Sequence, residues 1–327
     1  MEKSIRKLTS MAGHGDNDTN IMEGSILNNV YLYGMITSST VYILDKGFPF
    51  PQPNHYAEIE QYLPSVGGEA VNSAITLSKL GIKTKLDGNW LNQNNVNKVF
   101  DILKPFDIDV SRLAVKPNYG TEEIVITDKD SRTVFGNFAK FHSGEKQWNT
   151  PQEIDIQNAV LVSLDPYFKE ESLLVAQICV RHKKPYVTID CKYDDFMAQN
   201  AEAVIISHEL REKAYRDRNM LEVFEQYQAK CKGLIIFTFG SDELWYAGRG
   251  GKIKKFQPYK ITPVDTTGAG DSFRAGIIYG LLESWNDEAT IDFASAVAAC
   301  VCLTIPHALN APGLDGVLRF MEEHKRN

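Results

Sequence analysis

The chain has 327 residues, enough for one large domain or two smaller ones with a substantial core. Hydrophobic residues make up 43% and charged residues 24%, which is typical of a globular protein and excludes disorder or a fibrous repeat as the main state. The formal net charge of −7 argues against a nucleic-acid partner, because a phosphate backbone attracts strongly basic surfaces.

Residues 1–29 are polar and lack both periodicity and the apolar core of a signal peptide, so we expect a flexible tail. The sequence holds no apolar run of about eighteen residues, and we expect no membrane partner and a cytoplasmic protein. The five cysteines are odd in number and form no Cys-x-x-Cys pair. This pattern indicates reduced thiols rather than disulfides or a zinc site.

A β-rich run at residues 30–36 predicts a first buried strand. Three prolines within residues 48–53 exclude a central strand there, so the following stretch leaves the main body. Residues 123–127 and 133–138 flank the polar segment 128–131 and predict a β-hairpin.

From residue 158 onward the pattern becomes regular. Apolar runs alternate with amphipathic segments, which predicts a parallel sheet covered by helices on both faces. Four such runs occur, at residues 159–164, 186–190, 203–207 and 234–238. Because ligands bind beyond the carboxyl ends of such strands, Asp190, Ser207 and Thr238 are expected near the cleft. Three helical segments close the chain, at residues 270–283, 287–303 and 314–325.

The segment 265–273, Asp-Thr-Thr-Gly-Ala-Gly-Asp-Ser-Phe, carries the strongest chemical signal. Its small residues run directly into a helix, whose first N–H groups lack intrahelical partners and can bind a phosphate. Asp271 lies in the first helical turn, where it could accept a proton from a hydroxyl. A tight turn with a favourable first-turn carboxylate would by itself explain the same residues.

Residues 265–278 resemble the C-terminal signature of the ribokinase-like, PfkB-type sugar and nucleoside kinases. The segment 67–72, Gly-Gly-Glu-Ala-Val-Asn, is similar to the family's N-terminal Gly-Gly-x-x-x-Asn helix, and the ketohexokinase branch looks nearest. The resemblance implies a ribokinase-like three-layer αβα body with a mainly parallel central sheet plus a small β lid. The kinase domain would then span residues 30–327, with the lid built from about 39–62 and 115–141.

The resemblance also implies roles for particular residues. Asp271 would be the base that activates the acceptor hydroxyl, and the backbone of Gly268, Ala269 and Gly270 would hold charge on the transferred phosphoryl group. Four residues would contact the substrate: Gly67, Gly68, Asn72 and Ser39.

Nucleotide contacts would come from a strand end of the form Thr-x-Gly, matched by Thr238 and Gly240, and from Thr267. Asp265 and Thr267 match positions that bind a monovalent cation in some members, and a loop-stabilising role would suit them equally. The implied cofactors are ATP and Mg²⁺, with K⁺ as a further candidate.

Four departures from the family pattern bear on the substrate. Ser39 stands where the family usually has a sugar-binding aspartate, and a hydroxyl is a weaker acceptor than a carboxylate. An acidic position after Gly88 has become amide, and Ser-His-Glu at 207–209 replaces the Asn-x-x-Glu motif. Glu243 replaces a glycine beside the nucleotide strand end.

The leading hypothesis is an ATP-dependent sugar kinase. A nucleoside kinase on the same fold is an alternative, and so is a sugar- or nucleotide-binding protein with weak catalysis, which the lost acidic positions would suit. We also expect a homodimer through the lid, because a small sheet has exposed edges and an apolar face that a second copy could cover.

Overall fold

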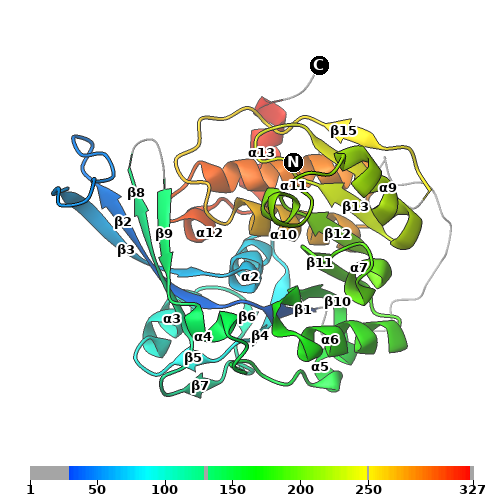
Figure 1. Cartoon of the computed structure of the whole chain (residues 1–327), viewed down its shortest axis with the longest axis horizontal. Coiled ribbons are helices and arrows are strands. Elements are labelled where there is room, and N and C mark those ends of the chain that lie inside the picture. Colours follow the sequence, from blue (N-terminus) through cyan, green and yellow to red (C-terminus); the bar gives the residue numbers. More distant parts are fainter. Residues whose placement is uncertain (1–28, 129–131, 249, 325–327) are drawn as a thin grey trace.

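The computed structural model describes residues 29–128, 132–248 and 250–324, so residues 1–28 of the predicted tail and 129–131 of the predicted turn lie outside it. A large sheet with helices on both faces forms the body, and a smaller sheet projects from it at the left of Figure 1. No helix among the described residues is long and apolar enough to cross a membrane.

The large sheet is parallel over most of its width. Its spatial order is β15 (Lys254–Phe256), β14 (Leu244–Ala247), β13 (Leu234–Phe237), β12 (Ala203–Ile206), β11 (Tyr186–Ile189), β10 (Ala159–Leu164), β1 (Asn29–Gly34), β4 (Lys83–Gly88) and β6 (Ile108–Asp109). Every neighbouring pair from β13 to β6 is parallel, and β14 and β15 add an antiparallel edge. The four predicted apolar strands are β10 to β13, which confirms that part of the prediction.

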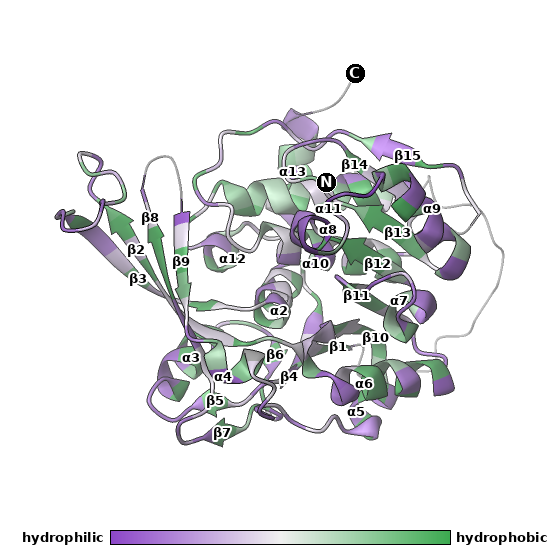
Figure 2. Cartoon of the chain, viewed as in Figure 1, coloured by the Kyte–Doolittle hydropathy of each residue, from purple (hydrophilic) through white to green (hydrophobic). Residues whose placement is uncertain are grey.

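Two apolar cores lie on opposite faces of this sheet because successive side chains of a strand alternate. Val30 and Leu32 of β1 enter one core, and Tyr31 and Tyr33 enter the other. The first core is covered by α2 (Glu69–Lys79), α3 (Val96–Leu103), α10 (Ala269–Leu282) and α11 (Asp287–Cys302). The second is covered by α5 (Glu153–Asn158), α6 (Glu170–Arg181), α7 (Phe196–Asn200) and α9 (Met220–Lys230). Figure 2 shows the apolar central strands between these amphipathic helices, and the three-layer body is confirmed.

The remaining elements are short or peripheral. They are β5 (Leu91–Asn92), β7 (Val115–Lys116), α4 (Ala139–His142), η1 (Pro166–Phe168), α8 (His208–Ala214), α12 (His307–Asn310) and α13 (Leu314–Glu323). The five cysteines are all free and buried, as the sequence pattern predicts.

The small sheet, called the lid from here on, has the order β3 (Ile59–Gly67), β2 (Thr37–Leu44), β8 (Thr121–Thr127) and β9 (Arg132–Gly136). β8 and β9 pair antiparallel as the predicted hairpin. Between β2 and β3 the proline-rich residues 45–58 form no strand. Within the span 115–141, β7 pairs with β5 outside the lid and α4 is helical, so only the middle of that span builds the lid sheet.

Glycines set the start and the packing of the two helices that matter most. Gly68, at φ 100°, joins β3 to α2, and a Cβ there would lie 2.5 Å from the Met35 carbonyl oxygen. Gly268, which adopts the left-handed conformation, directly precedes the first residue of α10. A Cβ at Gly276 would lie 2.5 Å from the Ala294 Cα, so α10 and α11 approach closely only because that position is glycine.

Candidate active site

The two recognised motifs meet where α2 and α10 come together. Asn72 of α2 donates through Nδ2 to Oδ2 of Asp271 at 2.8 Å, and the Ser73 hydroxyl donates to the Asp271 carbonyl at 2.9 Å. Gly268 lies against the same amide, since a Cβ there would be 3.3 Å from Asn72 Nδ2. The structure therefore places Asn72, Gly268 and Asp271 in one cluster.

Burial raises the pKa of Asp271, and nearby groups act on it in both directions. The Arg274 guanidinium and the Asn72 hydrogen bond lower this pKa, whereas the Asp165 carboxylate raises it. A raised pKa makes the carboxylate a stronger base than an exposed aspartate, and the cation keeps its ionised form accessible.

Arg274 is fully buried and ties three segments together beneath this carboxylate. Its Nη1 pairs with Asp165, its Nε donates to the Ser73 hydroxyl at 3.1 Å, and its Nη2 donates to the Glu69 carbonyl at 2.6 Å. Asp165 is also fully buried and accepts the Met35 N–H at 2.8 Å. The sequence analysis missed both, although Asp165 ends the apolar run 159–164 and so met the same criterion as Asp190.

The lid contributes a carboxylate that the sequence analysis also missed. Glu123 of β8 lies beside Ser39 in the β2–β8 register, and its carboxylate occupies the space that a Cβ at Gly67 would need. Burial raises the pKa of Glu123, while the nearby Ser39 hydroxyl and the Arg132 guanidinium lower it. Ser39 itself is fully buried, and its Oγ makes no hydrogen bond of ordinary geometry within the described residues.

A second lid residue contacts the loop before α10. Arg132 of β9 donates to the Thr267 hydroxyl at 2.5 Å. That hydroxyl and the Thr267 N–H both donate to Asp265 Oδ1, at 2.6 and 2.8 Å, so Asp265 does hold the loop. Asp265 Oδ2 is buried without a partner in the described part of the chain, and so is Nε2 of His307, whose pKa burial lowers to about 4.

Thr238 and Gly240, two of the three predicted nucleotide residues, lie farther along the carboxyl edge of the sheet. The N–H and hydroxyl of Thr238 donate to the Ile206 carbonyl at 3.0 and 3.4 Å, and its own carbonyl accepts a hydrogen bond from Arg211 at 2.8 Å. Gly240, at φ 67°, has nothing within 4 Å of where a Cβ would stand. The hydrogen bonds of Thr238 thus go to β12 and α8 rather than to the loop before α10.

Asp190 and Ser207 are paired beside them. Ser207 donates to Asp190 through its N–H at 2.7 Å and its hydroxyl at 2.8 Å, and it caps α8 by accepting the Leu210 N–H. Glu209 lies in the first turn of α8, where a carboxylate is favoured by the helix dipole. No cluster of three or more His, Cys, Asp or Glu side chains able to hold a metal occurs within residues 29–128, 132–248 and 250–324.

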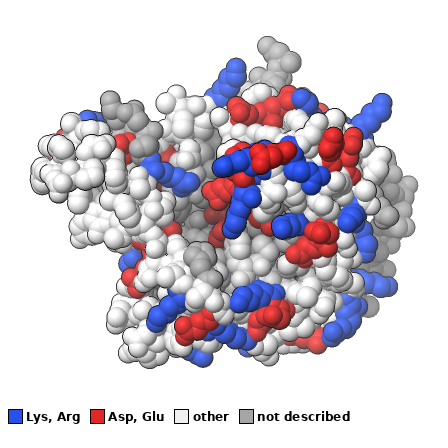
Figure 3. All heavy atoms as spheres, in the orientation of Figure 1, with Lys and Arg blue, Asp and Glu red and all other residues white. Residues whose placement is uncertain are grey.

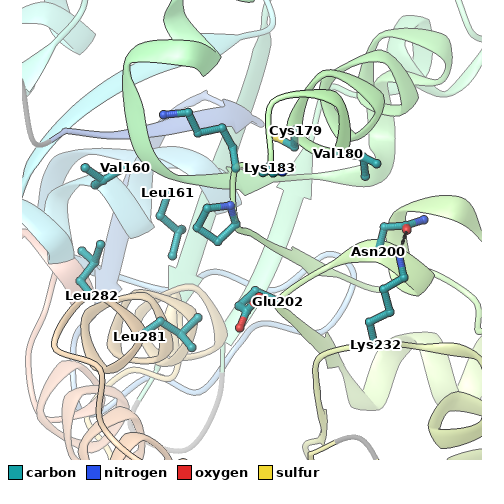
Figure 4. Close-up of a pocket in the computed structure, with 12 residues that line it drawn as sticks. Val160, Leu161, Cys179, Val180, Lys183, Asn200, Glu202, Lys232, Leu281 and Leu282 are labelled. Atoms are coloured by element: carbon teal, nitrogen blue, oxygen red, sulfur yellow. Dashed lines mark hydrogen bonds between the residues drawn. The ribbon is translucent and has the colours of Figure 1, made fainter. Parts of the chain in front are cut away.

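A cavity of about 610 Å³ lies at the opposite, amino edge of the same strands (Figure 4). It is lined among others by Leu161, Lys183, Glu202 and Leu282. None of the predicted site residues lines it, so it belongs to a different part of the molecule. Figure 3 shows instead a hollow between the lid and the body, on the side where the lid residues reach the loop before α10.

The chain has a mainly parallel α/β body, a projecting lid, and a glycine loop that leads into a helix with an aspartate in its first turn. These features define the class of ribokinase-like kinases. Within that class the chain belongs to the pfkB family of carbohydrate kinases, whose model matches residues 30–308.

Curated relatives and solved structures agree with this assignment. The chain is 22% identical over 288 residues to a 5-dehydro-2-deoxygluconokinase of Clostridium botulinum, covering 80% of this chain and 85% of that one. It is 24% identical over 293 residues to a nucleoside kinase of Methanocaldococcus jannaschii, covering 84% and 92%. The ribokinase of Arabidopsis thaliana, solved with ribose and ATP, shares the fold with a TM-score of 0.74 at 15% identity, over 90% of this chain and 99% of that one.

Proposed function

We propose that this carbohydrate kinase transfers the γ-phosphoryl group of ATP to a hydroxyl of a small sugar, with Asp271 as the general base. The observation that carries the proposal is the Asn72–Asp271 hydrogen bond of 2.8 Å, which joins the two motifs at the mouth of the glycine loop. The carboxylate removes the proton from the acceptor hydroxyl as that oxygen attacks phosphorus. Asn72 fixes its orientation, and Arg274 favours its ionised form.

The loop before α10 fits a transferred phosphoryl group. The first helical bond is made by the Ser272 N–H to the Gly268 carbonyl at 2.9 Å, and the Ala269 N–H makes only a long turn bond of 3.4 Å to the Thr266 carbonyl. The amides of Ala269 and Gly270 thus stand at the helix start, where an anion can recruit them. Gly270 is exposed, with nothing within 4 Å of where a Cβ would stand, so an anion can approach this backbone. These amides stabilise charge that develops on the transferred group.

ATP, when bound, supplies the phosphoryl group, and Thr238, Gly240 and Thr267 are the residues proposed to hold it. The open backbone at Gly240 allows close approach of a nucleotide. Mg²⁺ would enter bound to phosphate oxygens and water rather than to a protein cage. The buried, unpartnered Oδ2 of Asp265 is the oxygen that a K⁺ ion would use.

The acceptor site is proposed to lie between α2 and the lid. Gly67, Gly68 and Ser39 line its lid side, and Asn72 lines its floor. Oδ1 of Asn72 is buried without a partner in the described residues, so it offers a substrate hydroxyl an unused acceptor. The Ser39 hydroxyl is buried beside Glu123, whose pKa it lowers.

We further propose a cytoplasmic homodimer. Several apolar side chains on one face of the lid are exposed, with Tyr62 at 65%, Phe135 at 52% and Ile124 at 44%, and a second copy would cover them. In Figure 3 the lid lobe carries few charged side chains on the face in view. The free, buried cysteines suit a reducing compartment.

The function is tested by ADP release with a panel of sugars and nucleosides, in wild type and Asp271→Asn. Sugar-dependent release that falls about 10²- to 10⁴-fold in the variant supports the proposal. Asp315→Asn is the matched control, because Asp315 also lies in the first turn of a helix, α13, but outside this site. Release with nucleosides alone would favour the nucleoside kinase, and ligand binding without any release would indicate a binding protein.

A further inference from the structure

We propose that Glu123 supplies the carboxylate missing at Ser39 and makes the acceptor site select a hydroxyl-rich sugar without a carboxylate over a sugar acid. The inference rests on the proposed kinase function and names its substrate class. Glu123 reaches the site from β8, one strand away from Ser39, the position where the family pattern has an aspartate.

The strand register places this carboxylate. Ser39 pairs with Glu123 across the parallel β2–β8 ladder, and paired residues point to the same face of a sheet. The Glu123 carboxylate lies against the Cα of Gly67, in the space that a Cβ at that position would take. The lid therefore brings an acid from the next strand to the backbone that is proposed to contact the sugar.

The opposite end of the proposed acceptor site is Asp271. The Asp271 carboxylate is near enough to act on Glu123 electrostatically, while Arg132 acts on both carboxylates with the opposite sign. Glu123 on the lid and Asp271 at the start of α10 thus lie close enough to act on one bound substrate. A carboxylate can accept two hydroxyl donors at once, so Glu123 is suited to a vicinal diol whose neighbouring hydroxyl meets the base.

The charges around this space disfavour a sugar acid. Three carboxylates, Asp165, Glu123 and Asp271, lie with two guanidiniums, Arg132 and Arg274. Glu69 is not counted, because burial raises its pKa to about 8 and it carries little charge near neutral pH. Arg274 is held by Asp165, and Arg132 is hydrogen-bonded to Thr267.

The ammonium group of Lys98 does not face the proposed acceptor site. It donates to the Ser39 carbonyl at 2.8 Å and to the Thr40 hydroxyl at 3.2 Å. Because Thr40 alternates with Ser39 along β2, that hydroxyl lies on the face away from Glu123. Among the described residues, the guanidiniums near this space, Arg132 and Arg274, already act on its own carboxylates, so a substrate carboxylate would meet net repulsion from Glu123 and Asp271.

The experiment compares glucose and fructose with gluconate and glucuronate as acceptors, in wild type, Glu123→Gln and Glu123→Asp. Glu122→Gln is the matched control, because Glu122 is the neighbouring residue of the same strand and points to the other face. Each protein is assayed for kcat and KM by ADP release, and for sugar binding without ATP by thermal shift.

We expect wild type to prefer the neutral sugars by at least about 10-fold in kcat/KM. Glu123→Gln should raise KM for a neutral sugar about 10- to 100-fold with little change in kcat, as loss of a charged acceptor predicts. Glu123→Asp should keep part of the affinity, and Glu122→Gln should match wild type within about twofold.

An unchanged KM in Glu123→Gln, an equal effect in Glu122→Gln, or a preference for the sugar acids would each overturn the assignment while leaving the kinase intact. Release of ADP with none of the acceptors would instead overturn the kinase proposal. In that case the thermal shift still decides the role of Glu123, because neutral-sugar binding must be present in wild type and lost in Glu123→Gln.

Discussion

Replacement of the buried Arg274 by methionine should strongly destabilise the protein. The guanidinium is fully buried and holds Asp165, the Ser73 hydroxyl and the Glu69 carbonyl. Without it Asp165 keeps only the Met35 N–H, and an uncompensated buried carboxylate costs about 3–5 kcal/mol. We expect the free energy of unfolding to fall by that amount and Tm to fall by about 4–7 °C.

Urea unfolding of wild type, Arg274→Met, Asp165→Asn and the double variant measures this coupling. Asp165→Asn removes the orphaned charge but retains an oxygen for the Met35 N–H, so the double variant should recover at least about 1.5 kcal/mol relative to additivity. Arg216→Met serves as the control, since Arg216 is exposed and its pair with Glu212 should contribute under about 1 kcal/mol. Additive changes, or a loss below about 1.5 kcal/mol in Arg274→Met, would refute the buried-anchor argument.

The pH profile of Arg274→Met, if it folds, gives an independent measurement. Arg274 lowers the pKa of Asp271, so its removal should raise that pKa further. The acidic limb of kcat/KM should therefore move to higher pH. An unmoved limb would mean that Arg274 supports the fold without acting on the base.

Two further predictions concern stability. Burial and the neighbouring carboxylates raise the pKa of Glu69 to about 8. The protonated form therefore stabilises the folded state at pH 4, and this contribution is lost as pH rises toward 8. Relative to Glu69→Gln, wild type should lose about 2 kcal/mol between pH 4 and pH 9 after allowance for solvent screening, and parallel unfolding curves at both pH values would contradict this. Gly276→Val should cost at least about 1–3 kcal/mol in thermal melts because its side chain would meet the Ala294 backbone, whereas Gly270→Ala, which has open space, should melt near wild type.

Local patterns predicted most of the body. The runs that became β10 to β13 and the segment that became α10 carry their periodicity and their glycine signals within a few residues. The antiparallel edge strands β14 and β15 were not predicted, because they are short and only their pairing with β13 makes them strands.

The candidate site was predicted only where one segment carries its own signature. Asp271 and Asn72 belong to two such segments, and the structure joins them. Glu123 has no local signal, because an acid in an alternating hairpin strand normally faces solvent, and only the β2–β8 register brings it to the site. Arg274 lies inside the recognised signature, but its buried partner Asp165 is more than a hundred residues away, beyond the reach of any pattern.

The hydrogen bond between Asn72 and Asp271 closes a chain separation of 199 residues. A contact of that span forms late in folding, because a long loop must close before it gains anything. An N-terminal fragment that ends before α10, or a C-terminal fragment that begins after α2, lacks one of the two partners. Catalytic activity should therefore report completion of the whole fold, and a nascent chain still lacking α10 would lack the proposed base.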